Sequence, residues 1–231
     1  MRSRAAILSV MRPQITVGGG VTLTLVSVQN GNPTGPNYNG SSVTVTTEQA
    51  GDLVIAVGGW FDAAPVPSAP TGGGTWTQLC DITNATANQS EMAVYYKTST
   101  GGASNTYTLP ISPADAYVGA QALLTVYVLR KSDASTPAIA LGATYNGSAN
   151  PITLSAFTAA ASTGFLLVPV CAYNNPGGTP TGTGLTFVSD GGFSGVLEAS
   201  RYHASIVGTS VPAITITGQD FPACAAVIVV T

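Results

Sequence analysis

The chain has a single histidine, His203, which is its first candidate for acid–base chemistry. It stands in the run Arg201-Tyr202-His203-Ala204, inside a segment with the pattern of a β-strand. A catalytic histidine needs a partner such as a nucleophilic serine, and the sequence contains no Gly-x-Ser-x-Gly elbow or comparable motif. We therefore interpret His203 as a surface or hydrogen-bonded strand residue, with a general base as the alternative.

The carboxylates are few and scattered, which bears on acid–base and metal chemistry. Asp81 and Glu91 flank an Asn/Thr/Ala-rich loop between two strand-like segments and could converge, as the two acids of a glycosidase do. Asp52, Asp62 and Asp115 stand in turns or at strand ends, where an Asp side chain usually bonds the local backbone. Without an acidic cluster or an Asp-x-Asp-x-Asp run, we predict neither an acid–base pair nor a calcium site.

The remaining motifs do not indicate a cofactor. Cys80, Cys171 and Cys224 are far apart, and the chain has no Cys-x-x-Cys pair, so we predict no metal site. Each cysteine has the setting of a small buried hydrophobe, and a single bridge between two of them is the alternative. Gly72–Gly74 is followed by neither a lysine nor a helix start, so it is not a phosphate loop.

Aromatic residues are the remaining candidates for binding. Trp60 and Phe61 end an apolar run just before a Pro-rich loop, and Trp76 follows that loop. If exposed, these three side chains could contact a partner protein or stack on a glycan. Core packing is the competing interpretation, because aromatic residues at strand ends are usually buried.

Charge is the most unusual property of the chain. Only 17 of its 231 residues are charged, about 7%, against roughly 25% in an ordinary soluble domain. Arg2, Arg4 and Arg12 make the beginning basic, whereas the rest has four basic and ten acidic residues. We predict that this basic beginning is an arm for assembly, with a solvated tail as the alternative. We also predict that the acidic body does not bind nucleic acid. No apolar run approaches the roughly 20 residues of a spanning helix, so no membrane partner is expected.

Strand signals dominate the sequence and predict an all-β fold. The segments 21–26 and 43–46 alternate apolar residues with threonine, and Asp52–Trp60 is apolar almost throughout, which indicates a strand covered on both faces. Turn pairs such as Asn30-Gly31 and Asn146-Gly147 separate about fourteen such segments, the spacing of an antiparallel sandwich or barrel. The other predicted strands are 75–80, 92–97, 106–109, 122–130, 138–143, 153–157, 165–173, 185–189, 196–206, 213–217 and 223–230.

The domain organisation predicted from these signals is simple. Residues 1–20 form a short extended N-terminal arm and residues 21–231 form one sandwich domain. Gly51–Val57 resembles Thr163–Val170, and each segment precedes a Pro/Gly-containing loop and a short strand. This similarity favours pseudo-symmetric halves at about 42–145 and 151–231, although such units also recur by chance in β-rich chains.

The order of several motifs resembles a module of bacteriophage structural proteins. The motifs are Gly-Asp-Leu-Val-Ile-Ala-Val (51–57), a Pro-rich loop, Gly-Thr-Trp-Thr-Gln-Leu (74–79), Met-Ala-Val-Tyr-Tyr-Lys (92–97) and Asn-Thr-Tyr-Thr-Leu (105–109), and the similarity continues through 124–130 and 164–168. The module has Gly-Trp where this chain has Gly74-Thr75-Trp76, a one-residue insertion.

This resemblance implies a jelly-roll-like sandwich in a virion, in head decoration or in a tail, and it implies no catalytic residue. We accordingly predict a protein that is not an enzyme, needs no cofactor, and acts through contacts with copies of itself and with other virion proteins. A module of a tail or fibre that binds host-surface glycans is the alternative.

Overall fold

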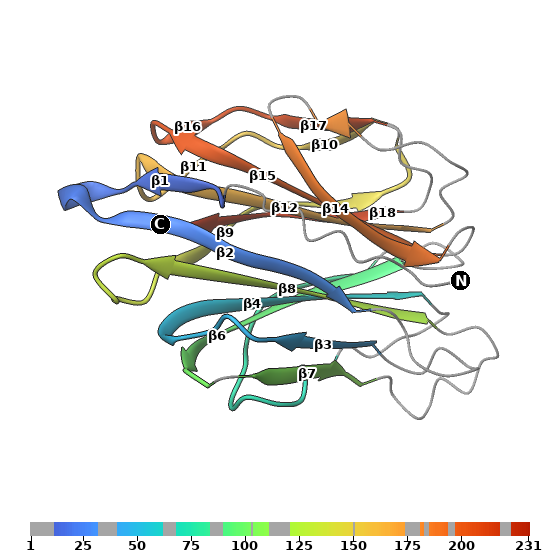
Figure 1. Ribbon diagram of the computed structural model, residues 1–231. Helices are drawn as coiled ribbons and strands as arrows, with labels where there is room; N and C mark the ends of the chain where they lie inside the picture. Colours follow the sequence, from blue (N-terminus) through green and yellow to red (C-terminus); the bar gives the residue numbers. More distant parts are fainter. Residues whose placement is uncertain are drawn as a thin grey trace, which may run out of the picture.

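Two large antiparallel β-sheets face each other at the centre of the molecule in the computed structural model (Figure 1). The structure describes residues 12–31, 41–61, 68–83, 90–102, 104–110, 121–149, 151–173, 181–182, 185–193, 197–217 and 223–231. The prediction of an all-β antiparallel sandwich is confirmed, while its jelly-roll connectivity stays a prediction.

The first large sheet has six strands. In spatial order they are β1 (Gln14–Thr16), β2 (Thr22–Gly31), β8 (Gln121–Lys131), β4 (Ala50–Phe61), β6 (Ser90–Thr100) and β5 (Thr77–Thr83). The single-turn 3-10 helix η1 (Gly18–Gly20) connects β1 to β2. Residues 14–16, which we assigned to the extended arm, thus form an edge strand, because their backbone pairs with residues 22–24. Residues 1–11 of the predicted arm lie outside the described residues.

The second large sheet has five strands. They are β14 (Thr186–Phe193), β15 (Leu197–Val207), β12 (Thr163–Tyr173), β18 (Ala223–Val230) and β9 (Ile139–Gly147). If β1 is left out, the spatial order is β2-β8-β4-β6-β5 in the first sheet and β9-β18-β12-β15-β14 in the second. The two orders follow the same pattern: when the five strands of each sheet are ranked by their place in the chain, both orders read first, fifth, second, fourth, third. The two similar sequence segments lie in β4 and β12, the central strands of these matching orders.

Small sheets cover the outer face of each large sheet. Strands β3 (Ser41–Val45) and β7 (Asn105–Leu109) cover the first. Strands β10 (Ile152–Leu154), β17 (Ile214–Thr217) and β13 (Thr181–Gly182), with the pair β11 (Phe157–Thr158) and β16 (Ser210–Val211), cover the second. Figure 1 shows these layers stacked from β7 and β3 at the bottom to β10 and β17 at the top. The segment 153–157, predicted as one strand, is split between β10 and β11, which belong to different small sheets.

The covering layers explain why the central strands are apolar on both faces. In β4, Leu53, Ile55 and Val57 point between the two large sheets. The alternate residues Val54 and Ala56 pack against the small sheet outside. Strand β18 does the same, and all eight of its residues are buried. Period-2 side-chain alternation thus fills both an inner and an outer core from one strand.

The two large sheets approach each other closely at Gly59 of β4. A Cβ atom at this position would lie 2.6 Å from the Sγ atom of Cys171 on β12, closer than real atoms pack. Gly59 is therefore required by the distance between the two central strands, and not by a turn.

Candidate functional site

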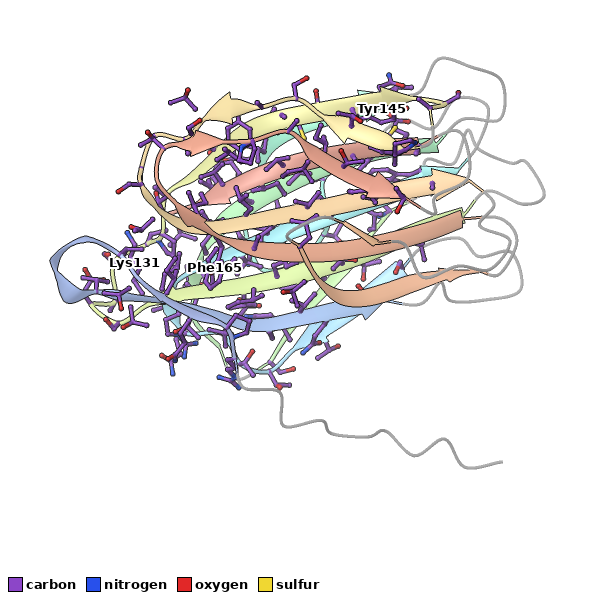
Figure 2. All side chains as sticks on the ribbon, turned by 90° about the horizontal axis from the view of Figure 1, so that it is seen from above. Lys131, Tyr145 and Phe165 are labelled. Carbon is purple, nitrogen blue, oxygen red and sulfur yellow. The ribbon has the colours of Figure 1, made fainter. Side chains whose placement is uncertain are left out.

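Strands β5 and β9 end the two large sheets on the same side of the molecule. They lie against each other, and the side-chain amide of Asn146 on β9 donates a hydrogen bond to the backbone carbonyl of Thr83 on β5. We call the surface formed by these two strands the lateral edge. In Figure 2, Tyr145 on β9 lies at one margin of the layered strands. A strand at the edge of a sheet directs some of its backbone groups away from the sheet, so this is a side where a further strand can be added.

The acidic pair suggested by the sequence lies beside the lateral edge. Asp81 is opposite Ala93 and Thr83 is opposite Glu91, so Asp81 and Glu91 share one face of the sheet as diagonal neighbours. Asp81 is exposed, whereas Glu91 is buried and accepts a hydrogen bond of 2.9 Å from the Thr83 hydroxyl. Burial, together with the charges of both carboxylates, raises the pKa of the nearby Tyr95 to about 12. The two acids therefore have different environments, one tied into the sheet and one available to solvent.

A second concentration of polar groups lies under the small sheet β3–β7. The carboxylate of Glu48 is almost fully buried, at 5% exposure. Its Oε2 accepts hydrogen bonds from Ser99 Oγ (2.8 Å) and Asn105 Nδ2 (2.9 Å), and its Oε1 accepts one from the Tyr107 hydroxyl (2.5 Å). Burial raises the pKa of Tyr107, and the hydrogen bond to Glu48 and the charge of Glu48 raise it further. We call Glu48, Ser99, Asn105 and Tyr107 the buried carboxylate cluster.

Lys97 of β6 connects this cluster to the turn at Gly72–Gly74. Its Nζ donates to the carbonyl of Gly73 (2.5 Å) and lies 4.6 Å from the ring centroid of Tyr107 and 5.2 Å from that of Trp76. The two rings meet edge to face, 5.3 Å apart. Trp76 also donates from Nε1 to the carbonyl of Gly72 (3.2 Å). Burial lowers the pKa of Lys97, and the charge of Glu48 opposes this change. The cation and the rings together fix the turn against the sheet.

A pair of glycine substitutions can test this contact. Gly73 and Gly74 both have positive φ, at 67° and 101°, so alanine strains the backbone at either position. A Cβ at Gly73 would collide with Lys97 Nζ and with the ring of Tyr107, whereas a Cβ at Gly74 meets nothing within 4 Å. We expect Gly73→Ala to lower the free energy of unfolding by about 1–3 kcal/mol more than the matched control Gly74→Ala. Urea unfolding of both variants measures the difference, and equal losses would show that the packing of the turn against Lys97 and Tyr107 does not stabilise the fold.

Asp52 and Arg130 form an ion pair at one end of β4 and β8. Arg130 donates from Nε and Nη2 to the two oxygens of Asp52, both at 2.7 Å, and Nη2 also reaches the carbonyl of Thr47 (2.8 Å). Asp52 accepts the backbone N–H of Gln49 at 2.8 Å, the local role that the sequence predicted for it. The hydrogen bond to Asp52 is the main cause that raises the pKa of Arg130. A buried carboxylate with this many donors serves to join strands and the preceding loop.

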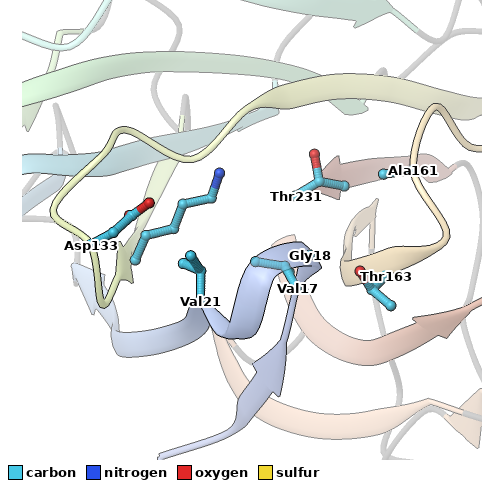
Figure 3. A pocket seen from close by; sticks show the side chains of 8 residues that line it. Val17, Gly18, Val21, Asp133, Ala161, Thr163 and Thr231 are labelled. Carbon is cyan, nitrogen blue, oxygen red and sulfur yellow. The ribbon is translucent and has the colours of Figure 1, made fainter.

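An open cavity of about 260 Å³ lies at one end of the sandwich (Figure 3). It is lined by Val17, Gly18, Val21, Lys131, Asp133, Ala161, Thr163 and Thr231. Its polar side chains are those of Lys131, Asp133, Thr163 and Thr231. Elements distant in sequence meet here, since the lining comes from both ends of the described chain and from the turns after β8 and before β12.

The aromatic candidates have different environments. Trp60 is 2% exposed and packs in the core between the first large sheet and β3–β7, so its ring is not available to a glycan or partner. Its position in β4 directs the side chain to the face that β3–β7 covers. The side chain of Phe61 lies outside the described residues, and Trp76 is half-buried. Among the described parts of these three residues, only Trp76 offers surface for contact.

Of the three arginines of the predicted basic arm, only Arg12 lies among the described residues. Arg12 is exposed, whereas Arg2 and Arg4 lie outside the described residues. Asp62 and Asp115 also lie outside them, as does the side chain of His203, whose backbone in β15 pairs with Leu167 and Thr186.

Two further searches concern metal ions and membranes. In the described parts of the chain, no three His, Cys, Asp or Glu side chains come close enough together to hold a metal ion. Over the same residues, no helix is long and apolar enough to span a membrane.

None of the three cysteines forms a disulfide in this structure, although Cys171 and Cys224 lie opposite each other on β12 and β18. Burial raises the pKa of the Cys80 thiol to about 11. Because only the thiolate reacts rapidly, we expect alkylation of the folded protein by iodoacetamide at pH 8 to be at least tenfold slower than that of a free thiol. Mass spectrometry should find three modified cysteines after unfolding, and fewer would indicate a bridge.

The buried carboxylate cluster was missed by reasoning from the sequence. Its members lie 51 to 59 residues from Glu48 along the chain, so no local motif brings them together. One signal was available: Lys97 is a charged residue at the end of an apolar strand, in a chain with very few charges. Such a residue usually has a partner inside the protein.

Comparison with known proteins identifies no relative. No family model matches the chain, and neither a curated protein nor a solved structure is similar to it.

Proposed function

We propose that this protein is a structural subunit of a bacteriophage virion and acts, without catalysis, through contacts with other protein chains. The phage assignment is supported by the order of sequence motifs described above. The mode of action is supported by the lateral edge, where β5 and β9 end both large sheets side by side and, in the described parts of the chain, no further strand lies beyond either of them. Asp81 is the one charged residue in these two strands. This observation carries the proposal, because open edges with little charge favour pairing with another chain.

The rest of the molecule is consistent with a rigid building block. Three apolar cores lie between four layers of sheet, and the buried charges of Glu48 and Asp52 are used to hold strands together. A rigid body loses little conformational entropy when it assembles, so repeated weak contacts can give a stable particle.

Immunogold electron microscopy of purified phage particles tests this proposal. We expect an antibody against the chain to label intact particles at a regular position on the head or the tail. We further expect a chain lacking residues 1–11, which include Arg2 and Arg4, to be incorporated less well if the basic arm grips a neighbour. Infected cells that contain the protein only outside particles would contradict the proposal.

Binding of a host-surface glycan is the second candidate, and Trp76 is the residue that favours it. Its half-buried indole is already held in place by Gly72, Lys97 and Tyr107, as a stacking platform requires. A glycan array probed with the wild-type chain and with Trp76→Ala separates the two functions. Binding that Trp76→Ala removes would support a receptor-binding module, and a silent array would leave assembly as the function.

A further inference from the structure

The two large sheets share one plan, and this plan includes the strands that cover them. We call residues 22–131, from β2 to β8, the first half, and residues 139–230, from β9 to β18, the second half. In the first half, β3 and β7 pair antiparallel outside the large sheet. In the second half, β10 and β17 stand at the same places in the chain order and also pair antiparallel. Each strand of the first half thus has a counterpart among β9, β10, β12, β14, β15, β17 and β18.

An irregularity in the pairing recurs at the same step in both halves. The register of β5 against β6 shifts between Gln78 and Cys80, after two regular residue pairs. The register of β14 against β15 shifts between Phe187 and Ser189, again after two regular pairs. A β-bulge adds one residue at a single point of one strand, so its recurrence at the same step supports the correspondence of β5 with β14.

Acidic residues also recur at corresponding positions. Asp81 and Glu91 are diagonal neighbours across β5 and β6. The register of β14 against β15 gives Asp190 and Glu198 the same diagonal relation. The whole chain has only ten acidic residues. Four of them at matching positions favour two halves that are versions of one unit.

Contacts between the halves are reciprocal. Strand β5 contacts β9 and β14 contacts β2, while β6 contacts β12 and β15 contacts β4. Strand β5 also contacts β18, as β14 contacts β8, and the central strands β4 and β12 contact each other. Exchanging the halves turns each of these contacts into its counterpart. Reciprocity of this kind is the property of an isologous interface, which two copies of one surface form around a two-fold axis.

We infer that this chain is a dimer of two equivalent half-domains in one polypeptide, and that the inner face of each half recognises a half of the same fold. The interface is apolar: Ile55 and Val57 of the first half lie in one core with Phe165, Leu167 and Ile228 of the second. Obligate dimers have interfaces of this kind, which resemble a domain core cut in two. In an assembly, one such chain takes the place of two subunits of half its size.

The connection between the halves lies outside both large sheets, and residues 132–136 are exposed. The backbone N–H of Ser132 donates to the carbonyl of Thr22 (2.9 Å), and that of Thr231 donates to the carbonyl of Ala138 (3.0 Å). These two bonds correspond, because each joins the end of a half to its own beginning. Each half is therefore closed by its own strands, and the interface should hold without the connection.

Cutting the connection in the full chain tests this inference. A protease recognition sequence inserted between Ser135 and Thr136 lies in an exposed turn, where insertions are best tolerated. After cleavage we expect one species in sedimentation velocity, with the circular dichroism spectrum of the uncut chain. Because the association is then bimolecular, each tenfold rise in concentration should raise the thermal midpoint by about 3–6 °C more than in the uncut chain. Fragments separated in urea should recombine on dilution.

The same insertion between Gly101 and Gly102 is the matched control. A cut there falls between β6 and β7 and separates β8 from β2 and β4, the two strands with which β8 pairs. We expect the control fragments to aggregate or to fail to recombine after urea. Equal behaviour of the two cut proteins, or loss of the fold on cutting after Ser135, would overturn the inference.

A circular permutant supplies a second test that needs no cleavage. It runs from Thr136 to Thr231 and continues through a Gly/Ser linker into Pro13 and on to Ser135. Val21 and Thr231 line the same cavity, so the linker can be short (Figure 3). If the halves are equivalent, their order along the chain does not matter, and the permutant should fold with the circular dichroism spectrum of the wild type. A permutant that stays unfolded would contradict this equivalence. Labelling of phage particles depends on none of these results, so the virion role is tested separately.

Discussion

Replacing Glu48 with alanine is expected to lower the free energy of unfolding by about 3–5 kcal/mol, the cost of breaking a buried charged interaction. The substitution leaves the Tyr107 hydroxyl and Ser99 without their acceptor inside the protein. It also removes the negative charge that opposes the desolvation of Lys97. Each buried donor without a partner adds a penalty, because water cannot reach it in the folded state.

Urea unfolding monitored by fluorescence measures this loss, and Thr44→Ala is the control. Thr44 bonds Thr106 across the same small sheet at 2.9 Å, but this pair is exposed, so its loss should cost about 0.5 kcal/mol or less. Glu48→Gln should fall between the two, because an amide keeps one acceptor and introduces donors next to existing donors. If Glu48→Ala were no worse than Thr44→Ala, the cluster would not hold the small sheet to the large one.

Leu167→Ala is expected to cost about 2–5 kcal/mol, because it opens a cavity between the two large sheets. Leu167 is fully buried in β12, the central strand of its sheet, and packs in the core shared by both large sheets. Close packing from both sides leaves the neighbouring side chains little freedom to collapse into the space.

The same substitution at Leu141 is the matched control, because that side chain is 40% exposed on the lateral edge. Its cost should be about 0.5 kcal/mol or less when unfolding is measured at low protein concentration, so that self-association does not contribute. A small effect at Leu167 would mean that the two large sheets do not share a tightly packed core.

The sequence by itself determined the class of fold. Alternation of apolar residues with threonine in 43–46 and the unbroken apolar run at 52–60 are local signals, and the structure confirms a half-covered strand and a strand covered on both faces. The cofactor-free, non-enzymatic virion role was also predicted from the sequence and stays a proposal. The similar segments 51–57 and 163–170 lie in β4 and β12. The two sequences are alike because both are central strands covered on both faces, which favours apolar residues at successive positions.

Only the tertiary structure decided which residues meet. The sequence left open whether Trp60 was a platform or core, and the answer depends on β3 and β7 covering that face of β4. It could not place Glu48 beside Tyr107 or Asn146 beside Thr83, pairs separated by 59 and 63 residues. Side-chain periodicity is fixed by the backbone of each strand, whereas strand pairing and layer stacking depend on contacts between segments far apart in the chain.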